Sequence, residues 1–311
     1  MTDNTAVKDY SNREARIRLT PKCNYKCFFC HEEGGCKAPV AEWESTRELL
    51  LALKRQNRRE ITFTGGEPLL NKRVLLKCLA EIASWDVQPE VTVITNGVYL
   101  DEVVIAALER CHSAKVHVSI HNPRDIGYQL VTGQRRRTAA ELKPILKRLS
   151  AGSVRLKLNV ALTEDYVRDD SVLKAMLVYA REVGAAAVKF VELLETKDAS
   201  RWPLKGAKVS DFNGRLIRLG LIGEHRTLRT AYWRTTDGIT LEVTRCACAL
   251  GCEHCDATRG DSFTGGTHYH PCFLDGFTVP MTGRTLDRVL AIGDEYIRRR
   301  IAATRVGRHA A

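Results

Sequence analysis

The chain has 311 residues, of which 44% are hydrophobic, so it can bury a sizeable core and a protein disordered in its main state is excluded. Its 48 Lys and Arg exceed its 37 Asp and Glu, and the net charge of +11 weakly favours an anionic ligand or a nucleic acid. No stretch has the roughly 18 uninterrupted apolar residues of a membrane span, and the N-terminus lacks the apolar core of a secretion signal. We therefore expect a cytoplasmic protein with no membrane partner.

From residue 16 to about residue 195 the sequence alternates between two kinds of segment. Short runs rich in Val, Ile, Thr or Phe predict buried strands, and the longer segments between them predict helices. The alternation predicts parallel βαβ units in an α/β fold, either an open sheet or a partial barrel, with ligands at the carboxyl ends of the strands. The strands are expected at 16–20, 60–64, 90–95, 115–120, 155–161 and 187–192, and the helices at 40–54, 72–84, 102–110, 138–149 and 171–183.

The pattern changes after about residue 200. A helix is expected at 210–219, followed by a hairpin of 228–235 and 239–244 that turns at Asp237-Gly238. The last segment, 285–303, predicts an amphipathic helix that ends in a basic run. We therefore expect two domains, residues 1–200 and 201–311, the second a small one that caps the first.

Eleven cysteines are the most unusual feature of the composition. A reducing compartment argues against a disulfide framework, so grouped thiols there indicate metal ligands. Most of them fall into two short groups. The first group contains Cys23, Cys27 and Cys30, and the second contains Cys246, Cys248, Cys252, Cys255 and Cys272.

The first group has the spacing C-x3-C-x2-C and directly follows the first predicted strand. Three thiolates can hold three irons of a 4Fe–4S cluster, which leaves the fourth iron open to a cofactor or substrate. The alternative is a closed zinc knuckle, with Cys36 or His31 as the fourth ligand.

Together with other motifs, this group resembles the radical S-adenosylmethionine (radical SAM) superfamily. The resemblance rests on the three cysteines and, in the family's order, on Phe29, Gly65-Gly66-Glu67-Pro68, Thr95-Asn96-Gly97, Ser119 and Lys157-Leu158-Asn159. It implies a partial (β/α)6 TIM-like barrel. It also implies that a 4Fe–4S cluster on the first group reduces S-adenosylmethionine, and that the resulting 5′-deoxyadenosyl radical abstracts a hydrogen atom from a substrate. Such an enzyme needs an electron donor such as flavodoxin or ferredoxin.

The resemblance also implies which residues bind the cofactor. Gly65 and Gly66 let the backbone approach its amino group, Glu67 accepts a hydrogen bond there, and Phe29 covers the adenine. Each residue also has an ordinary structural explanation, such as a turn carboxylate or a core aromatic ring. The remaining expected contacts are Thr95, Asn96, Ser119 and Asn159.

The second cysteine group resembles the auxiliary-cluster region of the subgroup that contains the GTP 3′,8-cyclases of molybdenum cofactor synthesis. This implies a second 4Fe–4S cluster, whereas the alternative is a zinc ribbon. Five cysteines exceed the four that one cluster needs. We expect Cys246, Cys252, Cys255 and Cys272 to ligate the cluster and Cys248 to donate a hydrogen atom to a substrate radical, with Cys246 as the reserve donor.

The chain departs from the cyclase pattern after Cys255, where only Arg259 remains of an expected Arg-x-Arg pair, so a GTP substrate is doubtful. Four carboxylates instead suggest a cationic amino sugar, and the reaction that we favour is inversion of a C–H centre of an aminoglycoside, of the kind that converts neomycin C to neomycin B. Alternatives are a radical cyclase, dehydrogenase, decarboxylase or peptide-modifying enzyme. A zinc-stabilised RNA-binding protein is disfavoured, because no stripe of basic and aromatic residues is present and aromatic residues make up only 7% of the chain. The four carboxylates are Glu192, Glu195, Asp256 and Asp261.

Overall fold

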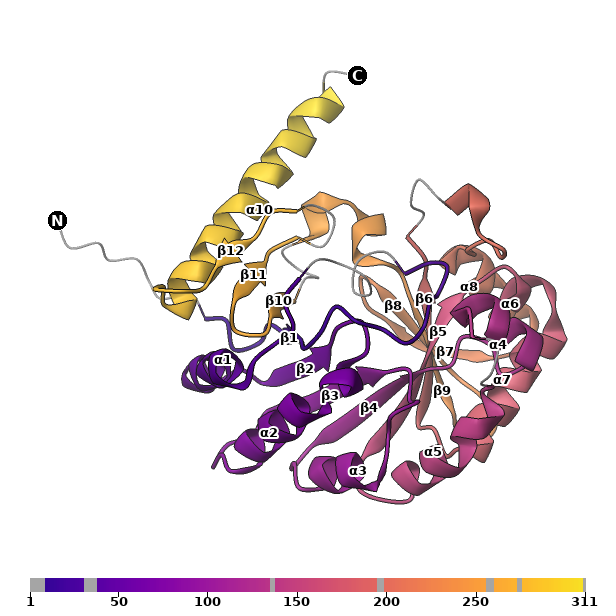
Figure 1. Ribbon diagram of the computed structural model, residues 1–311. Coiled ribbons are helices and arrows are strands. Elements are labelled where there is room, and N and C mark those ends of the chain that lie inside the picture. Colours follow the sequence, from indigo (N-terminus) through magenta and orange to yellow (C-terminus); the bar gives the residue numbers. More distant parts are fainter. Residues whose placement is uncertain are drawn as a thin grey trace.

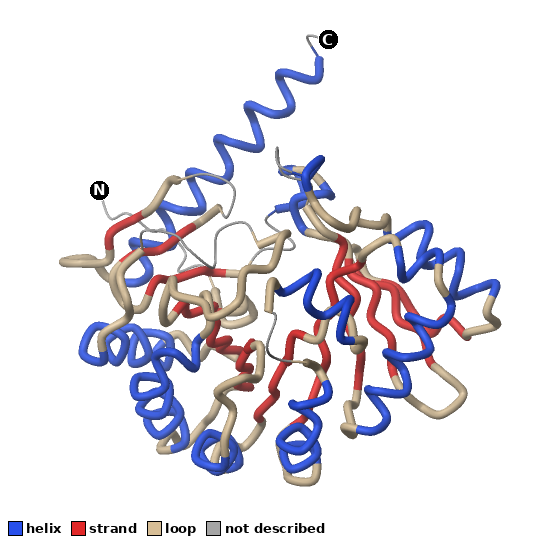
Figure 2. The backbone as a smooth tube through the Cα atoms, turned by 45° about the vertical axis from the view of Figure 1, so that its right-hand side comes forward, coloured by secondary structure: helices blue, strands red, loops and turns tan. Residues whose placement is uncertain are grey.

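The computed structural model describes residues 9–30, 38–134, 138–194, 199–255, 260–272 and 276–309. These residues build one curved sheet with helices along its outer side (Figures 1 and 2). The order of its strands is β12-β11-β10-β1-β2-β3-β4-β5-β6-β9-β8-β7. The strands are β1 Ala15–Arg18, β2 Glu60–Thr64, β3 Glu90–Thr95, β4 Ala114–Ser119, β5 Arg155–Leu162, β6 Ala187–Glu192, β7 Ile222–Arg226, β8 Thr230–Arg234, β9 Thr240–Thr244, β10 Asp261–Thr264, β11 His268–His270 and β12 Val279–Pro280.

The helices alternate with the strands through the first two thirds of the chain, as the sequence predicts. The α-helices are α1 Trp43–Arg55, α2 Lys72–Ala83, α3 Glu102–Glu109, α4 Asp125–Thr132, α5 Lys143–Ser150, α6 Asp165–Arg168, α7 Asp170–Glu182, α8 Val209–Arg218 and α10 Leu286–His309. Within the described ranges, no helix combines the length and the apolar character that crossing a membrane requires.

Strands β1 to β6 are parallel and lie in chain order, which confirms the α/β fold of a partial barrel. Their carboxyl ends meet at one edge of the sheet, here called the mouth. Strand β10 joins β1 in parallel, and β9 joins β6 in parallel, so the run of parallel strands continues at both ends. Antiparallel strands complete the sheet on either side.

The two faces of the sheet differ in polarity. Along β1 and the residue that follows it, the apolar side chains of Ile17 and Leu19 alternate with the charged ones of Arg16 and Arg18. The helices cover the face that carries the apolar residues, so the arginines lie on the opposite, concave face. We call this concave side the inner face.

The chain after residue 200 takes part in the same sheet rather than forming a sheet of its own. The predicted hairpin is present as β8 and β9, and the amide of Gly238 donates to the carbonyl of Thr235 in its turn. Strands β7, β10, β11 and β12 and helix α4 were not predicted, because these segments are short or lack a clear period. The boundary near residue 200 therefore marks the end of the β/α repeats, while the expected cap over the mouth stays a prediction.

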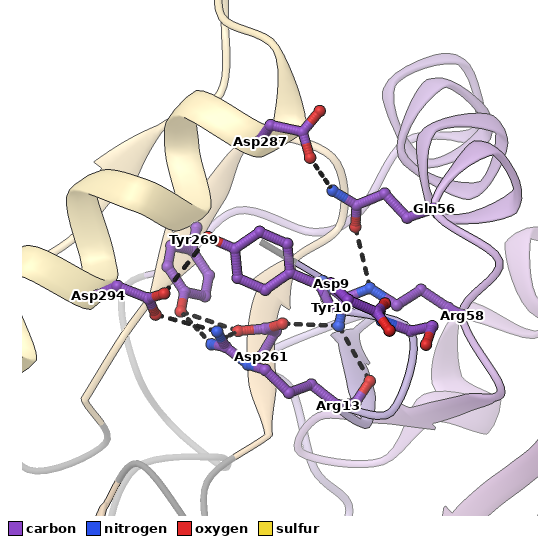
Figure 3. A network of polar contacts seen from close by, with 10 residues as sticks. Asp9, Tyr10, Arg13, Gln56, Arg58, Asp261, Tyr269, Asp287 and Asp294 are labelled. Atoms are coloured by element: carbon purple, nitrogen blue, oxygen red, sulfur yellow. Dashed lines mark hydrogen bonds and ion pairs between the residues drawn. The ribbon is translucent and has the colours of Figure 1, made fainter. Parts of the chain in front are cut away.

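Helix α10 is the long helix that projects from the body (Figure 1), and a buried polar network ties its first turns to the sheet (Figure 3). At its centre Arg58 Nη1 donates to Asp261 Oδ2 at 2.7 Å, and Arg13 donates to the same carboxylate. Arg13 also reaches Asp294 of α10 at 3.0 Å, and Tyr10 donates to Asp294. The network thus links the segment before β1, strand β10 and α10.

Candidate radical SAM site

The first cysteine group lies in the loop that follows β1, at the mouth of the sheet. Helix α4 supports this loop from below, since the amides of Lys26 and Phe28 donate to the carbonyls of Thr132 and Val131 at 3.0 and 3.3 Å. The hydroxyl of Tyr25 forms a short hydrogen bond with that of Tyr128 in α4. Helix α4, which the sequence did not predict, therefore holds the cysteine loop in place.

The three thiols of this loop lie close enough to influence one another. Burial raises the pKa of Cys27 to about 12, and the neighbouring Cys30 and Cys23 add to the effect. Burial likewise raises the pKa of Cys23. Cys30 is exposed at the end of the described loop, and the alternative zinc ligands His31 and Cys36 lie outside the described residues.

Gly65 and Gly66 follow β2 and lie directly against the start of the cysteine loop. A Cβ atom on Gly66 would lie 2.3 Å from the carbonyl oxygen of Lys22, and one on Gly65 would lie 2.4 Å from that of Thr20. The Gly66 amide donates to the Thr20 carbonyl and the Glu67 amide donates to the Lys22 carbonyl, each at 2.8 Å. In this structure the glycines therefore allow two loops to pack backbone against backbone.

Glu67 is fully buried and joins the loops that follow β2 and β3. Its carboxylate accepts hydrogen bonds from Thr95 Oγ1 at 2.6 Å, from the Asn96 amide at 2.7 Å and from the Leu69 amide at 3.0 Å. Burial raises the pKa of Glu67, while these three hydrogen bonds oppose the shift. Asn96 in turn donates to Asn24 Oδ1 at 2.7 Å, so the network extends into the cysteine loop.

Ser119 and Asn159 lie side by side on β4 and β5, where the sheet register pairs them. The Asn159 Oδ1 atom is buried and has no hydrogen-bond partner among the described residues. An amide oxygen buried in this way needs a donor, because an unmade hydrogen bond is costly. The pair therefore suits a polar ligand at the mouth.

Phe29 lies beside the end of β4, where its ring packs edge-on against His121 with centroids 4.9 Å apart. His121 accepts a hydrogen bond from the Ala161 amide through Nδ1 at 3.1 Å, and burial lowers the pKa of this histidine to about 4. Its ring is therefore neutral at physiological pH.

The second cysteine group begins immediately after β9, whose carboxyl end points to the mouth because β9 is parallel to β6. Cys248 is exposed, and its pKa is raised by a hydrogen bond with Cys246, by burial and by the nearby Cys272 and Cys255. Cys246, Cys255 and Cys272 thus lie near Cys248. Within the described ranges, no three Cys, His, Asp or Glu side chains surround a point that could hold a single metal ion.

The four carboxylates expected to face a substrate do not act as a set. Glu192 ends β6 at the mouth, is 7% exposed and lies 3.8 Å from Arg245 Nε. The expectation that Asp261 faces a substrate is wrong. Its side chain is fully buried on the outer face, in the network with Arg13 and Arg58. Glu195 and Asp256 lie outside the described residues.

Sequence reasoning missed a group of basic side chains on the inner face, whose only signal was alternation along the strands. Lys157 lies 2.5 Å from Glu242, and burial lowers the pKa of Lys189, which the charge of Glu242 opposes. Burial, with the charge of Lys157 the next largest cause, lowers the pKa of His117 to about 2. Arg16 and Arg18 complete the group.

Comparison with known proteins identifies the class. The family described as "Radical SAM superfamily" matches residues 17–166, the region that carries the first cysteine group and the loops after β2, β3 and β4. Residues 17–166 therefore match the radical SAM superfamily, and the chain is similar to the GTP 3′,8-cyclase subgroup.

The curated relatives that the chain matches include GTP 3′,8-cyclases. The chain is 26% identical over 295 residues to a probable GTP 3′,8-cyclase of Archaeoglobus fulgidus, an alignment that covers 92% of this chain and 94% of the relative. It is 35% identical over 159 residues to a probable GTP 3′,8-cyclase of Aeropyrum pernix, covering 48% of this chain and 43% of the relative, so here it spans less than half of the relative's length.

Solved structures support the fold. Streptococcus suis SuiB bound to S-adenosylmethionine superposes with a TM-score of 0.65 at 13% identity, over 89% of this chain and 63% of SuiB. AnSMEcpe with bound S-adenosylmethionine superposes with a TM-score of 0.61 at 14% identity, over 89% of this chain and 80% of the other. At such low identity these likenesses concern the fold alone.

Proposed function

We propose that this enzyme cleaves S-adenosylmethionine at the mouth and uses the radical to remove a hydrogen atom from a small substrate that carries an anionic group. When bound, the cluster and cofactor supply the electron and the 5′-deoxyadenosyl radical. Cys23, Cys27 and Cys30 would hold the cluster. The unpartnered oxygen of Asn159, with Ser119 beside it, would accept from and donate to the cofactor.

The observation that carries the substrate class is the charge of the inner face. The positive charges there come from Arg16, Arg18, Lys115, Lys157 and Lys189, against the carboxylates of Glu14, Glu60, Glu90 and Glu242. A site lined with cations favours an anionic ligand, because opposite charges attract more strongly away from water. The small excess of cations on the inner face supports a phosphorylated or carboxylated substrate rather than the cationic aminoglycoside expected from the sequence. The relatives' name, GTP 3′,8-cyclase, agrees with an anionic substrate.

Inversion of a C–H centre is the second candidate, because the chain has one cysteine beyond the four that an auxiliary cluster would use and Cys248 is exposed. When bound, the cofactor would supply the radical chemistry that removes a hydrogen atom from one face of the carbon. The thiol of Cys248 would return a hydrogen atom to the opposite face and become a thiyl radical. One electron from a reductant of the flavodoxin or ferredoxin type and one proton from solvent then restore the thiol.

The test uses anaerobically reconstituted enzyme with dithionite and S-adenosylmethionine in heavy water. Nucleotides, sugar phosphates and aminoglycosides are screened for 5′-deoxyadenosine and for product. We expect an anionic compound to give product, and C23A to abolish 5′-deoxyadenosine formation. C78A, which changes a core cysteine of α2, is the control. Cleavage of the cofactor by C23A would overturn the cluster assignment, and turnover of aminoglycosides alone would overturn the anionic substrate.

Heavy water also separates the two reactions. If Cys248 returns the hydrogen atom, the product carries one solvent deuterium at the inverted carbon, and C248A forms 5′-deoxyadenosine without epimer. A product that carries no solvent deuterium would exclude inversion by a thiol and leave cyclisation or oxidation.

A further inference from the structure

Arg18 is a buried guanidinium on the inner face of β1. Only 8% of the residue is exposed, and its Nε atom has no hydrogen-bond partner among the described residues. The register of the sheet places Arg18 between Thr64 of β2 and Thr264 of β10. Arg18 therefore lies five residues before Cys23, on the side of the inner face away from Lys157 and Lys189.

Arg18 differs from the other buried arginines. Among the described residues, Arg58 and Arg215 are equally buried, with 4% and 5% exposed, and each is paired with a carboxylate, Asp261 and Asp170 respectively. Arg18 has no carboxylate partner within the described part of the chain. Among the buried arginines of the described residues, Arg18 is thus the one without a carboxylate partner.

A buried charge without a partner destabilises a fold, because the charge has lost its water and gained no opposite charge. A fold retains such a group when something else supplies the anion. The surroundings of Arg18 are polar, since Thr264 Oγ1 beside it lies 2.7 Å from His270 Nε2. Two residues back on the same face, the Ser262 and Thr62 hydroxyls that flank Arg16 are buried without a partner among the described residues.

We infer that Arg18 binds an oxyanion of the substrate, a phosphate or a carboxylate, at a position separate from Lys157 and Lys189. A guanidinium can hold two oxygens of either group through two parallel hydrogen bonds, and the neighbouring hydroxyls can bind a further oxygen. The inference rests on the proposed function, and adds to it a second anionic group, or a second contact to the same group, on the β10 side of the site.

The test compares R18M with R58M in the reconstituted holoenzyme. Methionine approximates the length of the arginine stem and removes the charge. In the absence of ligand, R18M should unfold at the same temperature as the wild type or at a higher one, because it removes an unpaired buried charge. R58M should unfold at a clearly lower temperature, because it leaves Asp261 short of a partner. A drop in R18M similar to that in R58M would show a structural role and overturn the inference.

Binding of inorganic phosphate and of acetate is then measured by calorimetry at constant ionic strength. We expect R18M to weaken the tighter of the two by about tenfold or more, and R18K to restore part of the affinity. Tighter binding of phosphate would indicate a phosphorylated substrate, and tighter binding of acetate a carboxylated one.

If K189M loses anion binding and R18M retains it, the inference is wrong while the proposed function stands. If R18M weakens only the binding of S-adenosylmethionine, Arg18 serves the cofactor and the inference is also wrong. If the wild type binds neither anion, the inference about Arg18 is also wrong. The formation of 5′-deoxyadenosine would then test the proposed function by itself.

Discussion

At the scale of single residues, the surroundings of a side chain at the mouth can fix its protonation state, as they do for His121. His121 is buried beneath Phe29 and accepts a hydrogen bond through Nδ1, so the fold requires the neutral ring. Burial lowers the pKa of His121 to about 4, below the 6.5 of an unfolded histidine. A lowered histidine pKa stabilises the fold above the unfolded value, and that stabilisation disappears as the pH falls from 6.5 towards 4.

The prediction concerns H121Q, in which the amide oxygen can still accept from Ala161. Between pH 7 and pH 5 the free energy of unfolding of the wild type should fall by about 2 kcal/mol more than that of H121Q. Urea titrations at the two pH values measure the difference. His117, whose pKa is also lowered, is present in both proteins and cancels in the comparison. The exposed H112Q should follow the wild type, and an equal pH dependence of H121Q and the wild type would refute the assignment.

At the scale of elements, loops that follow neighbouring strands are packed together by contacts that leave no room for a side chain. Replacing Gly66 with Ala would place a methyl group 2.3 Å from the Lys22 carbonyl, so the cysteine loop must move. We expect G66A to lower the rate of S-adenosylmethionine cleavage about 100-fold, because a shift of about 1 Å at a reactive centre has an effect of that size. G276A is the control, since a Cβ there would contact nothing within 4 Å. Full activity of G66A would show that the loops are not coupled.

The contact between β10 and its surroundings depends on one carboxylate. In D261N the buried guanidinium of Arg58 loses the full charge of its partner, and Arg13 loses one of two carboxylates (Figure 3). We expect the free energy of unfolding to fall by about 3–5 kcal/mol, as when one member of a buried ion pair is removed. Urea unfolding checks this value. D287N, an exposed change on the same helix-to-sheet boundary, should stay within about 0.5 kcal/mol of the wild type. A small effect of D261N would mean that water or another group replaces the charge.

At the scale of the whole molecule, the sheet brings cysteines from distant parts of the chain to one edge. Cys23 follows β1 and Cys246 follows β9, and both strands run towards the mouth. The chain is therefore expected to carry two 4Fe–4S clusters, of which the first is implied by its family and the second remains a prediction.

Iron analysis of variants tests the second cluster. C255A and C272A should each lower the iron content by about four atoms per chain and leave the first cluster able to cleave S-adenosylmethionine. C78A should retain all the iron. If the wild-type protein contains zinc instead, or if the iron content of C255A and C272A is unchanged, the second cysteine group does not hold a cluster.

The sequence by itself determined the β/α repeats, the position of the first cysteine group and the order of the loops at the mouth, because these features depend on local periodicity and spacing. The bounds of β2, β3 and β6 agree with prediction for this reason. The tertiary structure decided the pairing of β10 with β1 and of β9 with β6, since such contacts join segments far apart in the chain. That pairing also fixed which face each side chain takes. It turned Asp261 outward to neutralise Arg58, and it turned Arg18 inward, one strand away, without a partner.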